Sequence, residues 1–294
     1  MARLIDQLSG RFRSDSPIQQ LTEDTVTSLP SGFVKRVLDL RDSMPEIQRR
    51  GQPGYVHLSD LVRLCARQQC LMVEGGISQE MTIVGSHRVL WKIGRAVEHH
   101  VRNQLIDGIP GEILGMWECP CGGTTRTGHK PTAQTLCTNC GRMVTLYREL
   151  TLFDHDNGVV GNPDVLLRHL DRYVTIEIKS MVKDQWDELR APKGDHIFQA
   201  IGYRRLLQIN GFPVHSDVCL IYTAKDFAWN SPYKEFHVRV TPTMESQLDD
   251  LFAEARRVKE WGTTHQMPER TCCSSRTSRR ARDCPVAERC FARD

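Results

Sequence analysis

Alternation of hydrophobic and polar positions is clearest in the middle of the chain. Two runs rich in β-branched residues, Val159 to Leu167 and Tyr173 to Ile178, alternate with a period of two and flank a short polar break. This pattern predicts a half-buried β-hairpin. Asp164 falls on the first strand, while Glu177 and Lys179 lie two apart on the second and therefore share one face. We expect two carboxylates and one ammonium to meet on this sheet.

Helical spacing of apolar residues appears on both sides of this hairpin. Residues 196–210 predict a helix that ends at Gly211 and places Gln199 and Tyr203 one turn apart on one face. A second helix is predicted around residues 92–105, a third from an N-cap at Ser59 through Cys65, and a fourth over residues 244–262. Residues 218–224 and 236–242 predict two further strands.

The three charged hairpin residues have a chemical use. The carboxylates of Asp164 and Glu177 and the main-chain carbonyl of Ile178 suit a hard divalent cation, which polarises a phosphoryl group and activates water. Lys179 can orient that water or offset negative charge as it develops. An isolated Glu-x-Lys would indicate no more than an exposed strand pair. Here it follows a Pro163-Asp164 pair and a hairpin, which makes a metal-dependent phosphodiesterase the favoured interpretation.

Pro163-Asp164 followed by Glu177-Ile178-Lys179 resembles the PD-(D/E)xK nuclease superfamily. The Gln199-x-x-x-Tyr203 pair on the next helix resembles the RecB-like branch, in which this pair lines the active site. The resemblance implies an α/β, restriction-endonuclease-like core with a mixed central sheet flanked by helices. It also implies Mg²⁺- or Mn²⁺-dependent hydrolysis of DNA, expected to be exonucleolytic on single strands or DNA ends.

The implied partners are DNA and the proteins of recombination, helicase, CRISPR or phage replication systems. The chain has no G-x-x-x-x-G-K-[ST] loop for an ATPase. The alternative is a non-catalytic DNA-binding or assembly protein that retains the nuclease fold, although all three hairpin residues are intact. An electron-transfer iron–sulfur protein would leave those residues without a purpose.

A further Mg²⁺ or Mn²⁺ ligand is expected on the helix around residues 92–105. Iron–sulfur relatives place a His there after G-x-x-x-H, whereas this chain has Glu98 at that distance from Gly94 and His99 one residue later. Glu98 is the preferred ligand because a carboxylate suits Mg²⁺, and His99 is the alternative.

Four cysteines indicate a zinc ribbon inserted at residues 117–147. Cys119-x-Cys121 and Cys137-x-x-Cys140 are two close pairs beside glycines, a pattern typical of a closed four-thiolate Zn²⁺ site. His129 is a weaker alternative ligand, and a disulfide or free thiols are the other interpretations. Arg126, His129 and Lys130 could contact DNA, although a solvated loop is the simpler expectation.

The cysteines at the two ends of the nuclease domain resemble the cluster ligands of RecB-like iron–sulfur nucleases, including the AddB and CRISPR-adaptation types. The implied [4Fe-4S] ligands are Cys65, Cys273, Cys284 and Cys290, in a C-terminal segment 271–294 that the cluster would tie to the N-terminal helix. Cys70 competes with Cys65, and Cys272 with Cys273. A second zinc site is the alternative to the cluster.

Composition adds little that is specific to one function. The 294 residues allow one elaborated domain or two, and a net charge of +3 neither demands nor excludes a nucleic-acid partner. We expect an N-terminal extension and linker at residues 1–52 and a RecB-like nuclease domain at 53–294. Without an apolar membrane span or a signal peptide, eleven cysteines indicate metal binding in a cytoplasmic protein of a bacterial, archaeal or phage-infected cell.

Overall fold

The computed structural model of this chain describes residues 55–63, 65–74, 85–131, 135–226, 232–282 and 284–293. The expected extension and linker at residues 1–52 lie outside these ranges. No helix in the described ranges is both long enough and apolar enough to span a bilayer.

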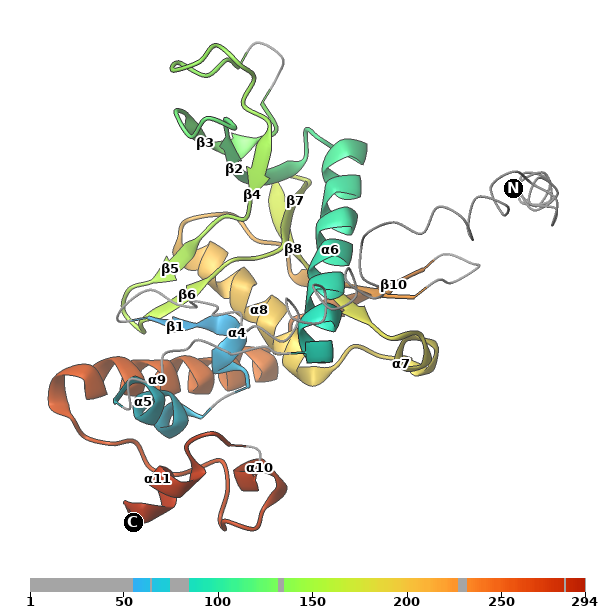
Figure 1. Ribbon diagram of the computed structural model, residues 1–294. Helices are drawn as coiled ribbons and strands as arrows, with labels where there is room; N and C mark the ends of the chain where they lie inside the picture. The colour runs from blue at the N-terminus through green and yellow to red at the C-terminus, as the bar shows by residue number, and fades with distance from the viewer. Residues whose placement is uncertain are drawn as a thin grey trace, which may run out of the picture.

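A mixed seven-stranded sheet forms the centre of the molecule (Figure 1). Its main path runs in the order β10-β9-β8-β7-β2-β3, and β4 pairs with β2 beyond the point where β2 leaves β7. Among the described strands of this sheet, β8 and β9 pair in parallel and the other pairs are antiparallel. The strands are β2 (Ile113–Glu118), β3 (Thr125–His129), β4 (Leu146–Arg148), β7 (Val165–His169), β8 (Arg172–Met181), β9 (Asp217–Ala224) and β10 (Tyr233–Arg239).

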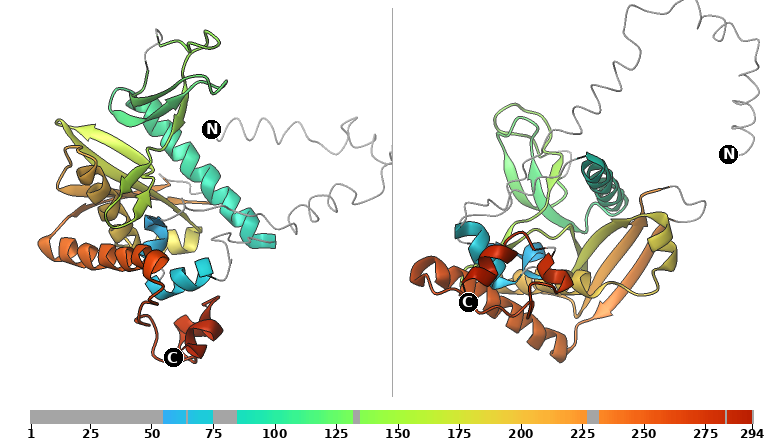
Figure 2. Two further views of the ribbon diagram at one scale, coloured as in Figure 1. Left: turned by 90° about the vertical axis from the view of Figure 1, so that its left-hand side faces the viewer. Right: turned by 60° about the horizontal axis from the view of Figure 1, so that its bottom comes forward.

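Helices cover both faces of this sheet, as the two views in Figure 2 show. On one face, α6 (Gly85–Gly108) packs Val101 and Ile106 against Ile176 and Ile178 of β8. On the other face, α8 (Gly194–Ile209) and α9 (Pro242–Thr264) bury their apolar residues against β7 and β9. The expected mixed sheet flanked by helices is therefore present.

The local sequence explains where the helices on the second face begin and end. Thr241 caps α9, because its side-chain oxygen accepts a hydrogen bond from the main-chain N–H of Met244. Pro242 occupies the first turn, where the N–H that proline lacks would have no partner within the helix. The predicted helix at 196–210 is α8, and Gly211 follows it with φ +82°, a conformation that glycine adopts without strain.

The predicted hairpin is only partly correct. β7 and β8 do form it, joined by Leu170 and Asp171 at φ +47° and +61°. The run from Val159 to Leu167 is not one strand, because β6 (Val159–Gly161) leaves the main sheet and β7 starts only at Val165. Pro163 has no N–H for a sheet ladder, which favours a break between the two strands. Asp164 accordingly lies just before β7 and not on a strand.

A small second sheet and a C-terminal subdomain complete the structure. The sheet has the order β1-β6-β5, with β1 (Val56–His57) and β5 (Leu152–Asp154) on either side of β6. In the subdomain, α5 (Ala66–Glu74) packs beside α9 and against α11 (Ala287–Ala292). The remaining short helices are α4 (Leu58–Leu61), α7 (Lys183–Glu188) and α10 (Arg279–Arg282).

The helix predicted from an N-cap at Ser59 through Cys65 is wrong in three respects. It is divided into α4 and α5, and Cys65 lies just before α5. The N-cap of α4 is His57, whose ring nitrogen accepts the N–H of Ser59. The Ser59 hydroxyl is instead hydrogen-bonded to the His57 ring at 2.8 Å.

Candidate functional site

Asp164, Glu177 and Lys179 converge as the sequence predicts. The main-chain N–H of Ile178 donates a hydrogen bond to Asp164 Oδ2 at 2.7 Å, which ties the residue before β7 to the middle of β8. Glu177 and Lys179 lie on one face of β8, and their side chains form an ion pair. The Glu177 side chain is only 1% exposed. Two acidic groups and one cation therefore occupy a mostly buried site.

Glu98 reaches this site from α6. The helix approaches β8 closely at Gly94, where a Cβ atom would lie 3.0 Å from Ser180 Oγ. Glu98 follows one turn later and lines an open cleft, as does His99. His99 is also within 3.2 Å of the Asn103 amide on the exposed side of α6. The structure thus places both candidate ligands at the cleft.

The cleft is lined by residues from both sheets and from α6 and α8. Most of them are charged, polar or aromatic, which suits a polar or charged ligand better than an apolar one. They are His57, Ser59, Arg63, Trp91, Arg95, Ala96, Glu98, His99, Arg102, Glu149, Asn162, Asp164, Lys179, Gln199 and Tyr203.

Burial dominates the electrostatics of these carboxyl groups. It raises the pKa of Glu177 to about 8, with the Asp164 charge adding to the effect. Burial and then Asp164 also raise the pKa of Glu98 to about 7. The pKa of Asp164 is raised by burial as well, although Lys179 opposes the shift. Burial alone would lower the pKa of Lys179, but Glu177 and Asp164 outweigh it and the pKa rises.

Two buried oxygens in this region lack a protein partner. Glu177 Oε2 has none among the described residues, and neither has the side-chain oxygen of Gln199. Gln199 donates its amide N–H to the Tyr203 hydroxyl at 3.0 Å, so the predicted helix pair is formed. A buried carboxylate oxygen without a donor is costly, and a bound cation would satisfy it.

The carboxylate oxygens of Glu98, Asp164 and Glu177 are suitable ligands for a divalent cation, but the distances between them are too long for all three to bind one ion. Oxygen ligands of one Mg²⁺ lie at about 2.1 Å from the ion, hence at most about 4.2 Å apart. In the described part of the chain, the oxygens of Glu98, Asp164 and Glu177 do not form a set within 4.8 Å of one another. Binding one ion by all three therefore requires side-chain rotation toward the ion.

Arg102 and Glu149 are among the charged residues of the cleft that sequence reasoning missed. Arg102 lies on α6 one turn after Glu98, and its guanidinium forms an ion pair with Glu149, which follows β4. No motif marks either residue. The helical spacing from Glu98 to Arg102 could have placed the arginine on the same face.

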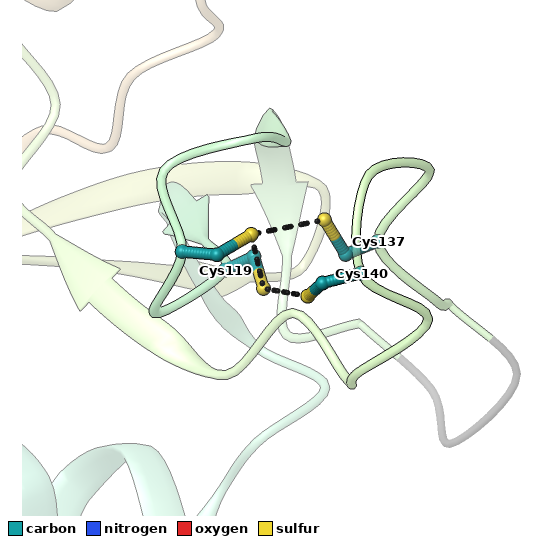
Figure 3. Close-up of side chains that lie close together, drawn as sticks. Cys119, Cys137 and Cys140 are labelled. Carbon is teal, nitrogen blue, oxygen red and sulfur yellow. Dashed lines mark hydrogen bonds between the residues drawn. The ribbon is translucent and has the colours of Figure 1, made fainter.

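The four ribbon cysteines form a compact group (Figure 3). All four Sγ atoms lie within 4.8 Å of one another, and their thiols come from two turns that face each other. His129 is not part of this group, since its ring stacks on Tyr173. Four thiols at this spacing can hold a tetrahedrally coordinated metal ion.

The region that carries the four ribbon cysteines is connected to the central sheet more closely than a separate insertion would be. β2 starts at Ile113 and pairs with β7, so the cysteine-bearing turns extend the central sheet. Of the three residues considered for DNA contact, Lys130 forms an ion pair with Asp107, and His129 is partly buried. Arg126 is exposed on β3.

The structure gathers the cysteines at the two ends of the nuclease domain around one small cavity. The thiols of Cys272 and Cys273 are 3.5 Å apart, and Cys272 also interacts with Cys65. Five cysteines line the cavity: Cys65, Cys272, Cys273, Cys284 and Cys290. Cys70 is buried and is not among them. The predicted convergence is therefore present, with one thiol more than a four-thiolate site needs.

Cys219 lies in the core, as the sequence predicts. Its thiol nevertheless faces Glu235 at 3.8 Å, and the His237 ring lies 2.5 Å from the same carboxylate. Pairing of β9 with β10 sets Cys219 opposite His237, an arrangement that the sequence did not reveal.

Comparison with known proteins gives limited similarity. No protein-family model matches the chain, and no curated protein matches it. The chain is similar to the structure of SSO0001, with 16% identity and a TM-score of 0.43, over 89% of this chain and 97% of that chain.

The chain is also similar to an alkaline exonuclease (LHK-Exo) from Laribacter hongkongensis, with 15% identity and a TM-score of 0.42. LHK-Exo in complex with dAMP gives 17% identity and a TM-score of 0.40. Both comparisons cover 72% of this chain and 93% of that chain.

Proposed function

We propose that this protein is a Mg²⁺- or Mn²⁺-dependent nuclease of the PD-(D/E)xK superfamily, RecB-like branch, that hydrolyses DNA from single strands or ends. The observation that carries the proposal is the meeting of Glu98, Asp164 and Lys179 at one open, polar cleft, with the buried Glu177 ion-paired to Lys179 behind it. Surface ion pairs alone would not explain why a carboxylate that is 1% exposed has an oxygen without a partner.

The carboxylates of Asp164 and Glu177, the carbonyl of Ile178 and the carboxylate of Glu98 would hold the cation. A divalent ion in such a site lowers the pKa of bound water and polarises the phosphoryl oxygen. Lys179 lines the cleft and carries its charge beside the reacting phosphate. Water oxygen bonds to phosphorus as the P–O bond to the leaving group breaks, which gives a phosphate monoester and a hydroxyl.

The cysteine groups are proposed to be structural metal sites. Cys119, Cys121, Cys137 and Cys140 would bind Zn²⁺, because four thiolates within 4.8 Å suit a closed site. The cavity lined by Cys65, Cys272, Cys273, Cys284 and Cys290 would hold a [4Fe-4S] cluster through four of its five thiols.

Degradation of end-labelled single- and double-stranded DNA, with and without Mn²⁺, tests the proposed activity. We expect cleavage that requires the metal and disappears in Asp164→Asn. Asp249→Asn is the matched control, because this carboxylate lies on α9, pairs with Arg205 and is 63% exposed. Metal-independent cleavage, or DNA binding without cleavage at any divalent ion, would favour the non-catalytic alternative.

A further inference from the structure

Three side chains that can bind a metal ion meet at the edge of the central sheet, outside the cleft. They are the thiol of Cys219 on β9 and, on β10, the carboxylate of Glu235 and the ring of His237. One ligand atom from each residue lies within 4.8 Å of the other two. The three residues line neither the cleft nor the cavity that the five other cysteines surround. The group is therefore a separate candidate site.

The pairing of β9 with β10 brings these side chains together. Cys219 lies directly opposite His237 in the antiparallel register, and Glu235 shares the face of His237 because it lies two residues earlier. Side chains directly opposite one another have Cβ atoms about 4.5 to 5.5 Å apart, a distance that one bound ion can bridge. Because two paired strands carry all three residues, their arrangement depends on the sheet and not on a loop.

Burial gives the group an inner and an outer side. Cys219 is 4% exposed and belongs to the hydrophobic cluster that α6 covers, whereas the side chains of Glu235 and His237 are 59% and 63% exposed. Phe236 and Val238, the alternate residues of β10, pack into the core on the opposite face of the sheet. An ion bound here would be held by one buried thiol and two side chains that can adjust, and it would stay open to water.

A surface ion pair accounts for only part of this arrangement. The ring of His237 lies 2.5 Å from Glu235 Oε1, as in an exposed His–Glu pair. The thiol of Cys219 lies 3.8 Å from the same oxygen, although a buried cysteine commonly packs as a small hydrophobic residue. In tetrahedral Zn²⁺ coordination, a sulfur and an oxygen ligand are about 3.6 Å apart, close to the distance here. His237 and Glu235 would need to separate by about 1 Å to admit the ion.

The types of ligand favour Zn²⁺ over hard cations. Zn²⁺ binds thiolate and imidazole well, whereas Mg²⁺ and Mn²⁺ take mainly oxygen ligands. Three protein ligands leave the fourth position of a tetrahedral ion for water. The thiolate and the carboxylate carry two negative charges, which one Zn²⁺ ion neutralises. The neighbouring cation on β10, Arg239, is already paired with Asp217 at 2.9 Å.

We propose that Cys219, Glu235 and His237 bind one Zn²⁺ ion in an open, three-ligand site that joins the edge strand β10 to β9. The site does not depend on the proposed nuclease activity, because its residues lie outside the cleft. Metal binding to the folded state contributes directly to stability. The expected effect of the ion is therefore to stabilise this edge of the sheet, while the rate of DNA cleavage stays the same.

Zinc binding by matched variants tests the site. Three ligands hold an ion less firmly than four thiolates, so the full-length protein is purified anaerobically with its other thiol sites filled and is then titrated with Zn²⁺ in a calorimeter. We expect His237→Ala to bind one Zn²⁺ ion fewer than the wild type. Glu235→Gln should bind that ion at least about tenfold more weakly. Added Zn²⁺ should raise the Tm of the wild type more than that of His237→Ala.

His100→Ala is the matched control, because His100 is also an exposed histidine but lies on α6. It should bind as many zinc ions as the wild type. Co²⁺ added in place of Zn²⁺ tests the buried ligand, since thiolate-to-cobalt absorption should appear in the wild type and be absent from Cys219→Ala. If Cys219→Ala does not fold, the two variants at exposed positions carry the test. Equal zinc stoichiometry and affinity in the wild type and His237→Ala would overturn the inference.

Discussion

The carboxylate of Asp164 accepts a hydrogen bond from the main-chain N–H of Ile178, with 2.7 Å between Oδ2 and N. This bond places a residue that precedes β7 against the strand that carries Glu177 and Lys179. It uses one of the two carboxylate oxygens of Asp164. The three chemical groups are thus assembled by one main-chain contact together with the β7–β8 register.

Variants at the two β8 residues should remove cleavage and retain the fold. Glu177→Gln and Lys179→Ala are each expected to lower the rate by on the order of 10³-fold or more, because they act together on one reacting centre. Circular dichroism should remain that of the wild type. Cleavage near the wild-type rate by Glu177→Gln would contradict the site assignment.

The raised pKa values predict how pH acts on metal-free protein. Glu177 and Glu98 have folded pKa values of about 8 and about 7, above their unfolded values, so the folded state binds more protons between about pH 4.5 and 8. Stability should therefore fall as pH rises through this window. Thermal unfolding from pH 5 to 8.5 measures it, and Glu177→Gln should flatten the decline. Added Mn²⁺ should stabilise the protein more at pH 8.5 than at pH 6.

Gly161→Ala tests the packing behind the site. A Cβ atom at Gly161 would lie 2.7 Å from a ring carbon of Tyr203, which is buried and cannot move freely. Overpacking of this kind costs about 1 to 3 kcal/mol of stability. Denaturant unfolding should show that loss, and cleavage should fall because Tyr203 supports Gln199. Gly262→Ala in α9 is the control, since its Cβ would meet nothing within 4 Å.

Loss of the ribbon metal should be a local event. We expect Cys137→Ser combined with Cys140→Ser to remove about one zinc ion per chain, as a single four-thiolate site requires. DNA affinity or substrate preference should change more than the rate of the chemical step. Metal analysis and DNA binding measure the two effects. Global unfolding of this variant would show that the ribbon metal stabilises the whole sheet.

Loss of the metal held by the cysteines at the two ends of the nuclease domain should affect the stability of the whole protein, unlike loss of the ribbon metal. Anaerobically purified protein is expected to be brown, and iron with acid-labile sulfide should be present. Cys284→Ser should lose the iron and become insoluble or sensitive to protease, because this site joins α5 to the C-terminal segment. Colourless protein with two zinc ions per chain after anaerobic preparation would support the alternative zinc site.

The sequence pattern predicted the β7–β8 hairpin, α8 and the shared face of Glu177 and Lys179. It did so although burial does not alternate along β8, where the four residues from Thr175 to Ile178 are all buried. The break after Gly161 was missed although Asn162 and Pro163 mark it, because the apolar residues on either side were interpreted as one strand and their sequence does not show that they join different sheets. Glu149 was missed for another reason. Its place in the cleft depends on β4 pairing with β2 and on Arg102, contacts between residues far apart in sequence.

The buried side chain of Arg67 imposes an order on the maturation of this chain. Two of its hydrogen-bond acceptors, the carbonyls of Pro268 and Cys290, lie 201 and 223 residues further along. At a synthesis rate of about 5 to 20 residues per second, they leave the ribosome roughly 10 to 45 s after Arg67. For that interval α5 lacks the C-terminal segment on which it docks, while Asp164 and the strand that carries Glu177 are already synthesised. A nascent chain could thus complete its cleft before its two ends are joined, and α5 would be the surface open to chaperones.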